Sequence, residues 1–214
     1  MKTLLLTAFE PFGPYTKNVS KKLVQKLQGT MLKNDTSNEI NIVGVVLPIE
    51  FHRFRKVLQH EVEKYSPHIV VGLGMDFKDQ SSLSFELLAH RTPSYGTTIS
   101  DNKGIFGQNK KLDTLAEELR LPNEHQLTNI ITKIDGIELS EHAGGFMCET
   151  VFRDLIRLSE NGTKFQPIFI HVPHTKNLLQ ESKKLEEHTH YESIEKQEMI
   201  LKEVLTRLIQ VSTT

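Results

Sequence analysis

Residues 52–74 have the sequence HRFRKVLQHEVEKYSPHIVVGLG, in which a helix pattern leads directly into a strand pattern. In residues 52–65 the large apolar side chains recur at helical spacing, which predicts an amphipathic helix. Residues 68–74, HIVVGLG, form the short apolar run that is typical of a strand buried on both faces. A helix that alternates with buried strands in this way indicates a mainly parallel sheet with helices on both sides.

The same alternation extends in both directions along the chain. Further strands are expected at 3–9, 40–48 and 167–173, and further helices at 19–27, from about 146 onward and at 191–208. Asn18 is the expected cap of the first helix. We therefore predict an α/β protein, a three-layer α/β/α sandwich with a mainly parallel twisted sheet. Residues 80–105 are less regular and are expected to form a hairpin or excursion from that sheet.

Composition and patterning narrow the classes of function. No repeat or linker divides the chain, so residues 1–214 are expected to form a single domain. The net charge of −1 gives no reason to expect nucleic acid or an anionic membrane as a partner. No stretch approaches the length of a membrane span, and the apolar run near the start is too short for a signal peptide. These features predict a cytoplasmic protein.

The chain contains one cysteine, Cys148, within EHAGGFMCETVF at residues 141–152. A single cysteine excludes an internal disulfide framework and a cysteine-cluster metal site. Cys148 lies at the expected start of a helix, where unpaired N–H groups and the helix dipole favour a thiolate. The two preceding glycines allow a sharp turn and a close approach to a substrate. The alternative is that Cys148 is a small apolar residue packed in the core.

A nucleophilic thiol needs a base within reach, and the base needs a group that orients it. In sheets of this kind the catalytic and binding residues lie at the carboxyl ends of the strands. Here the segments at these ends are FEPFG, LPIEF, GLGMD and HVPHT. His171 ends the strand PIFIH, and Glu86 is a carboxylate in the mostly apolar segment SSLSFELLAHR. His174 is expected to be a loop residue. His188 and His190 could ligate a metal, but a solvated helix start is the preferred interpretation, so no metal site is predicted.

Several segments together resemble one family of enzymes. They are LLTAFEPFG followed by Asn18, VVLPIEF, HIVVGLG, ISDNKG, SEHAGGFMCETVF and FIHVP, in that order. The chain resembles the pyroglutamyl peptidase I family of cytosolic cysteine exopeptidases. The resemblance implies that Cys148 is the nucleophile, His171 the general base and acid, and Glu86 the carboxylate that orients the histidine. It also implies an α/β/α sandwich, no metal or cofactor, and peptides with an N-terminal pyroglutamate as substrates.

The resemblance further suggests how the flat, uncharged lactam ring would be held. The implied substrate-binding residues are Phe9, Phe12, Asn18, Gly74, Met75, Phe146 and Met147. The three phenylalanines would form the walls, and main-chain groups near the glycine would contact the lactam. An ordinary core role is the alternative for each phenylalanine. The N–H of Cys148 would be one oxyanion donor.

The chain also departs from the pattern of that family. Glu149 follows the cysteine where asparagine is common, and Met75 follows the strand-end glycine where bacterial members usually have glutamine, with no arginine before Glu86. Thr98 precedes ISDN where many members have arginine, and Arg91 could replace that arginine only from another direction. The alternative function is therefore a catalytically weak or inactive relative that binds pyroglutamyl or other N-terminal groups. The resemblance suggests an oligomeric state between monomer and tetramer.

Overall fold

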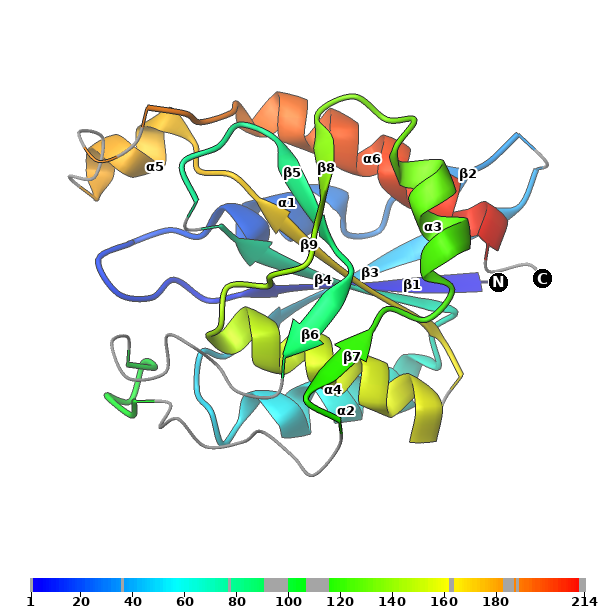
Figure 1. Cartoon of the computed structure of the whole chain (residues 1–214), viewed down its shortest axis with the longest axis horizontal. Coiled ribbons are helices and arrows are strands. Elements are labelled where there is room, and N and C mark those ends of the chain that lie inside the picture. Colours follow the sequence, from blue (N-terminus) through cyan, green and yellow to red (C-terminus); the bar gives the residue numbers. More distant parts are fainter. Residues whose placement is uncertain are drawn as a thin grey trace.

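The computed structural model describes residues 2–35, 37–76, 78–90, 100–106, 116–161, 164–182, 187 and 189–211. The strands are β1 (Lys2–Phe9), β2 (Met31–Lys33), β3 (Glu39–Leu47), β4 (Ile69–Met75), β5 (Leu83–Glu86), β6 (Leu88–His90), β7 (Glu118–Arg120), β8 (Ile137–Ser140) and β9 (Gln166–Val172). The helices are α1 (Val19–Leu27), α2 (Phe54–Tyr65), α3 (Glu124–Ile131), α4 (Met147–Asn161), α5 (Lys176–Glu181) and α6 (Ile194–Val211). Helices cover both faces of a central sheet (Figure 1).

The main sheet has seven strands in the order β2-β3-β1-β4-β9-β5-β8. β3, β1, β4 and β9 run parallel, β2 joins one edge antiparallel, and β5 is antiparallel to β9 but parallel to β8. The register places His171 of β9 beside Gly74 of β4 on one side and beside Ser84 of β5 on the other. This register places the start of β5 beside the carboxyl ends of β4 and β9.

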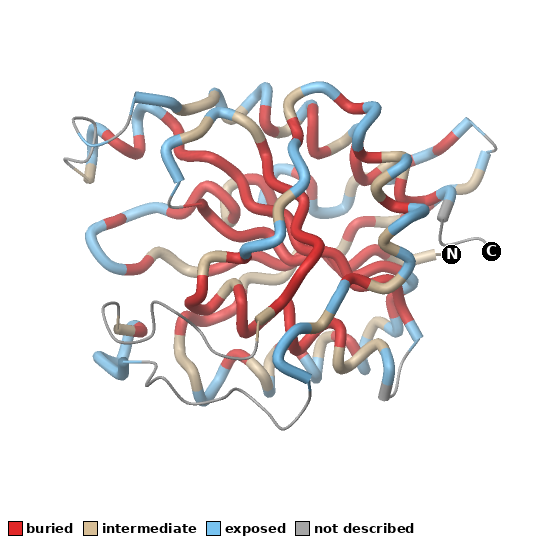
Figure 2. The backbone as a smooth tube through the Cα atoms, viewed as in Figure 1, coloured by how far each residue is buried: buried red, intermediate tan, exposed pale blue. Residues whose placement is uncertain are grey.

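The helices form two layers. α1, α3 and α6 pack on one face of the sheet, and α2 and α4 pack on the other (Figure 1). All seven residues of β4 and all seven of β9 are buried, as expected for strands that are covered on both faces. Figure 2 shows the buried residues concentrated along the central strands and the inner sides of the helices. The predicted α/β sandwich with a mainly parallel sheet is confirmed.

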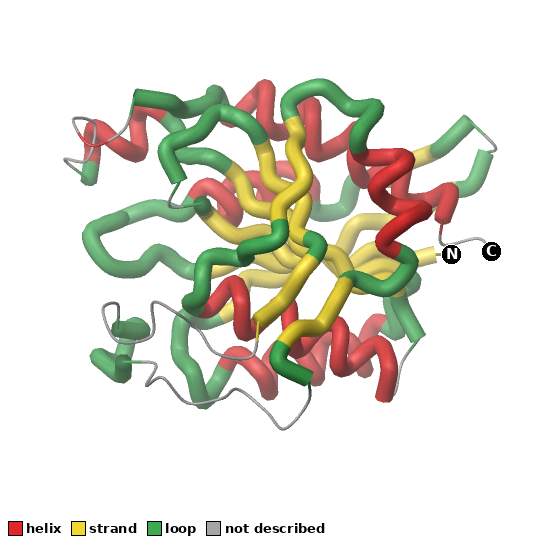
Figure 3. Tube along the Cα trace, in the orientation of Figure 1, coloured by secondary structure: helices red, strands yellow, loops and turns green. Residues whose placement is uncertain are grey.

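The predicted strands and helices agree with the observed ones to within a few residues. The last helix begins at Ile194 rather than 191, and the helix that carries Cys148 begins at Met147. Asn18 caps α1 as predicted, since its side chain accepts a hydrogen bond from the N–H of Ser20. Figure 3 shows loops gathered on the left of the view, where β1 and β4 end. No helix in the described part of the chain is long and apolar enough to cross a membrane.

The expected excursion over residues 80–105 begins later than predicted. Leu83–Glu86 forms β5 inside the main sheet, where all four residues are buried. The chain leaves this sheet only at Leu88, when β6 pairs with β7 in a separate two-stranded sheet. A single bridge joins Ser100 to Phe106, and residues 91–99 and 107–115 lie outside the described part of the chain. Short strands such as β5 carry too few residues for a pattern to place them.

Candidate active site

Cys148 is the second residue of α4, as the sequence predicts. The preceding glycines both adopt left-handed backbone angles, with φ of 83° at Gly144 and 69° at Gly145. Residues with a side chain rarely adopt such angles, so the two glycines permit the sharp turn into the helix. Phe146 and Met147 are buried beside this turn, whereas Cys148 is partly exposed. The turn therefore presents the thiol to solvent from the first turn of a helix.

His171 lies next to last in β9 and forms a short contact with Glu86. Nδ1 of His171 and Oε1 of Glu86 are 2.7 Å apart, and the two side chains are 4% and 0% exposed. Glu86 is the last residue of β5, the strand antiparallel to β9. With Nδ1 fixed by the carboxylate, the other ring nitrogen is free to face a second group.

That second group is the thiol of Cys148, which approaches the ring beside Gly74. A Cβ atom built on Gly74 would lie 2.7 Å from Sγ of Cys148 and 2.9 Å from Nε2 of His171. Gly74 thus leaves open the space in which the sulfur and the ring nitrogen meet. The structure brings together the three predicted catalytic residues, one each from β5, α4 and β9.

The electrostatic surroundings of His171 favour its protonated form. Burial by itself would lower the pKa of the ring, but the adjoining Cys148 and Glu86 outweigh burial and raise this pKa well above its ordinary value. A thiolate on one side and a carboxylate on the other both stabilise the imidazolium. The arrangement can therefore hold a thiolate–imidazolium pair.

A cavity of about 300 Å³ opens beside the thiol. The described residues that line it are Asp76, Lys78, His142, Ala143, Gly144, Phe146, Cys148 and His171. Its volume is at the lower end of the range of small-molecule sites. Of the described residues, no group of three or more His, Cys, Asp or Glu side chains is placed to hold a metal ion.

The predicted substrate-binding residues occupy different places around this cavity. Phe146 lines it, and the Phe12 ring lies 6.0 Å from the Phe146 ring, centroid to centroid. Phe9, Met75 and Met147 are at most 2% exposed and pack in the core. Gly74 lies beside the thiol, as described above, and Asn18 is engaged as a helix cap, with its Nδ2 donating to the carbonyl of Glu10.

Sequence reasoning missed several residues of this region. Phe51 packs edge-on against Phe146 with centroids 5.6 Å apart, and Asp76, Lys78 and His142 line the cavity. Phe51 and Asp76 fall in LPIEF and GLGMD, two of the four segments that follow strands. Their position after the carboxyl end of a strand could have identified them as candidate site residues. His174, expected in a loop, follows β9 but is buried, and its ring stacks on Tyr15 at 5.3 Å. His188, Arg91 and Thr98 lie outside the described residues.

Glu149 points from α4 toward β6. One carboxylate oxygen accepts a hydrogen bond from the N–H of His90 at 2.5 Å, and the other is buried without a hydrogen-bond partner. Arg153, one turn further along α4, donates to the carbonyls of Ala89 and Ala116. Burial raises the pKa of Glu149 above its ordinary value, against the opposing effect of the His90 amide and of the His90 and His142 rings. Glu149 therefore fastens the start of the excursion to the helix that carries the thiol.

The raised pKa of Glu149 predicts a pH-dependent effect of Glu149→Gln on stability. The folded protein holds the Glu149 proton more tightly than the unfolded chain does. The free energy of unfolding therefore falls as pH rises from the ordinary glutamate range through the higher folded pKa. Glutamine cannot ionise, so the variant does not lose stability in this way. As pH increases over this range, the melting temperature of the variant should therefore rise relative to that of the parent.

The control for this prediction is Glu138→Gln, which changes an exposed glutamate on β8. Melting temperatures measured by circular dichroism from acidic to neutral pH should show no such trend for Glu138→Gln. A difference between Glu149→Gln and the parent that is constant with pH would contradict the assignment of a raised pKa to this carboxylate.

Comparisons with known proteins identify the family and the fold of this chain. A sequence profile of the family described as pyroglutamyl peptidase matches residues 1–202. Pyrrolidone-carboxylate peptidase 2 of Saccharolobus solfataricus is 29% identical over 179 residues, which cover 80% of this chain and 79% of the relative. The crystal structure of pyrrolidone carboxyl peptidase from Pyrococcus furiosus matches with a TM-score of 0.84 at 21% identity, covering 99% of this chain and 100% of that chain. The enzyme of the same name from Thermococcus litoralis gives a TM-score of 0.83 at 23% identity, covering 98% of this chain and 94% of that chain. Because the profile match spans nearly the whole chain, this protein belongs to the pyroglutamyl peptidase family.

Proposed function

We propose that this protein is a cysteine exopeptidase that removes pyroglutamate from the N-terminus of peptides, with Cys148, His171 and Glu86 as its catalytic residues. The observation that carries the proposal is the placement of a buried imidazole between a carboxylate and a thiol at the rim of a cavity. Membership of the family supports the choice of substrate. The geometry supports the choice of nucleophile and base.

The reaction begins when Nε2 of His171 takes the proton of the Cys148 thiol. The thiolate attacks the carbonyl carbon of the pyroglutamyl residue and forms a C–S bond. The C–N bond then breaks as His171 returns the proton to the leaving amine, which leaves a thioacyl-enzyme. Water attacks this thioester while His171 accepts one of its protons, and release of pyroglutamate regenerates the thiol. Glu86 stabilises the imidazolium that forms in each half-reaction.

The oxyanion of each tetrahedral intermediate requires hydrogen-bond donors. Cys148 is in the first turn of α4, where N–H groups have no partner within the helix. The N–H of Cys148 is therefore one donor to this oxyanion, and the positive end of the helix dipole adds to its effect.

The acyl side of the site suits a flat, uncharged ring. Phe146, with Phe12 and Phe51 packed against it, forms an aromatic wall beside the thiol. Phe9, Met75 and Met147 are buried in the core beneath the site. In this proposal the main chain at Gly74 and Met75 contacts the lactam. Asn18 holds the loop that carries Phe12 through its bond to the Glu10 carbonyl. The lactam N–H and C=O need few polar partners, so the wall supplies most of the contact.

This pocket predicts a strong preference for the closed lactam. We expect the aminomethylcoumarin amide of pyroglutamate to be cleaved with a kcat/KM at least ~10²-fold above those of the glutamyl and prolyl amides. Open glutamate would lose the hydration of its charged groups without gaining a partner, and proline lacks the lactam carbonyl. Release of the fluorophore measures all three rates directly.

Comparable kcat/KM values for pyroglutamyl and glutamyl amides would contradict the proposed pocket, as would a preference for the prolyl amide. A chain that fails to cleave the pyroglutamyl amide, yet is stabilised against heat by a pyroglutamyl peptide, would instead be the inactive binding relative.

A further inference from the structure

Lys78 is a cationic side chain that lines the cavity and has no role in the proposed catalytic mechanism. It is the only lysine or arginine among the described residues that line the cavity. Its ammonium donates to Oγ of Ser140 at 3.3 Å, and no carboxylate of the described residues forms an ion pair with it. The side chain is exposed, so its positive charge is available to a molecule that enters the cavity.

The loop that carries Lys78 is fixed on both sides of this residue. Asp76 accepts hydrogen bonds from the N–H of Lys78 at 2.9 Å and from the side chain of Gln80 at 3.0 Å. Asp79 accepts hydrogen bonds from the N–H groups of Thr189 and His190, at 2.8 and 2.6 Å, and from the Thr189 hydroxyl. These bonds hold the pKa of Asp79 well below its ordinary value. The main chain at Lys78 is therefore held before a substrate arrives, which reduces the entropy cost of binding.

The order of the strands separates Lys78 from the aromatic wall. The aromatic wall lies toward β1, since Phe12 follows that strand, whereas Ser140, the partner of Lys78, ends β8. His171 is on β9, which lies between β1 and β8 in the sheet. In the proposed mechanism His171 protonates the leaving amine. A pyroglutamyl ring held at the aromatic wall would then direct the peptide beyond the scissile bond from His171 toward β8.

We propose that Lys78 binds a carboxylate on the residue that follows pyroglutamate, an inference that rests on the proposed peptidase function. Two sources carry such a group: the α-carboxylate of a pyroglutamyl dipeptide, and an acidic side chain in a longer peptide. The Asp76 carboxylate is 6% exposed and already accepts two hydrogen bonds, so the ammonium is the charge that an incoming carboxylate meets.

The test compares matched substrates that differ by one charge. Pyroglutamyl-alanine with a free carboxylate is measured against its amide, and pyroglutamyl-glutamate amide against pyroglutamyl-glutamine amide, at low ionic strength. For an exposed charge pair we expect the charged member to be preferred by about two- to fivefold in kcat/KM. A preference in the first pair alone identifies the α-carboxylate, and one in the second pair alone identifies the side chain.

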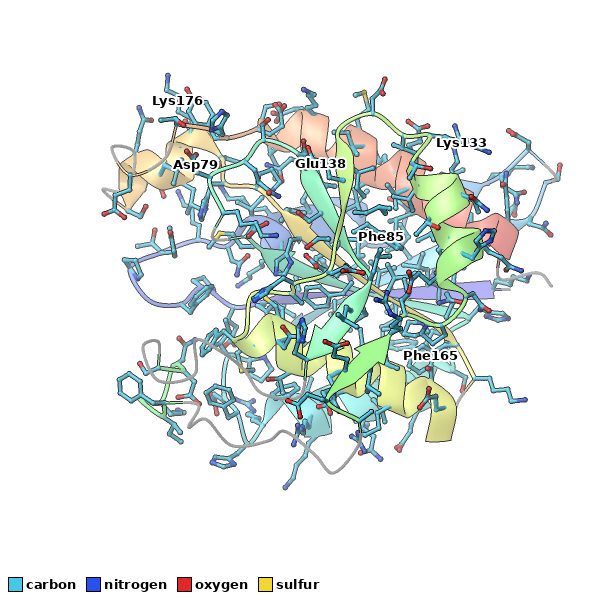
Figure 4. All side chains as sticks on the ribbon, in the orientation of Figure 1. Asp79, Phe85, Lys133, Glu138, Phe165 and Lys176 are labelled. Atoms are coloured by element: carbon cyan, nitrogen blue, oxygen red, sulfur yellow. The ribbon has the colours of Figure 1, made fainter. Side chains whose placement is uncertain are left out.

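The variants are Lys78→Met, Lys78→Glu and, as a matched control, Lys133→Met. Lys133 is an exposed lysine at the far end of the molecule from Asp79 (Figure 4). We expect Lys78→Met to abolish the preference, Lys78→Glu to reverse it, and Lys133→Met to retain it. Added salt should reduce the preference of the parent for the charged substrates.

The neutral pyroglutamyl coumarin amide separates the two proposals. If the parent and Lys78→Met cleave it equally well but share the same preference for the charged substrates, the role of Lys78 is overturned and the peptidase function stands. If the parent does not cleave the neutral amide at all, the peptidase function fails and the role of Lys78 fails with it.

Discussion

Replacing Cys148 by serine should lower kcat/KM on a pyroglutamyl amide by ~10⁴-fold or more, with the fold retained. The hydroxyl has nearly the shape of the thiol but is a far weaker acid, so His171 cannot hold it as an anion. The side chain is partly exposed, and its loss leaves no large void in the core. Turnover and the melting temperature measured on the same preparation separate the chemical effect from a folding defect.

The single cysteine makes chemical modification an independent measurement of the same group. One equivalent of iodoacetamide should abolish activity, and mass spectrometry should find one adduct on the peptide that contains Cys148. The serine variant should take up no label. Normal turnover by Cys148→Ala at an unchanged melting temperature would exclude Cys148 as the nucleophile.

Glu86→Gln should lower kcat by ~10²-fold or more while KM changes little. Glutamine keeps the shape of the side chain and can still accept a hydrogen bond from Nδ1 of His171, but it removes the charge. Without that charge the pKa of His171 falls, because the carboxylate is one of the two groups that raise it. Less thiolate is then held near neutral pH, so alkylation of Cys148 should slow as well. Glu138→Gln, on the neighbouring strand β8, is the matched control and should leave both rates unchanged.

The coupling between Glu86 and His171 can be measured with a double mutant. His171→Ala should be at least as damaging as Glu86→Gln, and the double mutant should be scarcely slower than His171→Ala alone. The reason is that Glu86 acts only through the ring that His171→Ala removes. If the two losses multiplied in the double mutant, Glu86 and His171 would act separately and the proposed triad would be wrong.

The sequence was sufficient to predict the elements that are long and buried. β1, β4 and β9 are continuous apolar runs, and their carboxyl ends had to meet at one edge of a parallel sheet. Cys148 and His171 could be placed at this edge for the same reason. Glu86 was suspected because a carboxylate had no packing reason to be in an apolar segment. The structure buries this carboxylate in β5, in contact with Nδ1 of His171.

Other features depend on tertiary contacts that leave little trace in a local pattern. β5 and β8 have four residues each, and only their pairing with neighbouring strands makes them strands. The orientation of Glu149 toward His90 is set by the packing of α4 on β6, which one helix pattern cannot reveal. Lys78 lies in a polar loop that resembles any surface connection until the bonds made by the aspartates beside it are seen.

On the proposed function, the space beside Gly74 also determines how this protein could lose its activity during evolution. Every other amino acid brings a Cβ, which here would lie 2.7 Å from Sγ and 2.9 Å from Nε2. A mutation in this one codon would therefore push the sulfur and the ring nitrogen apart, while the cysteine, the histidine, the glutamate and the aromatic wall all remained in the sequence. A descendant that carried it would lose the proposed peptidase activity, and an inspection of the three positions of the proposed triad would not reveal the change.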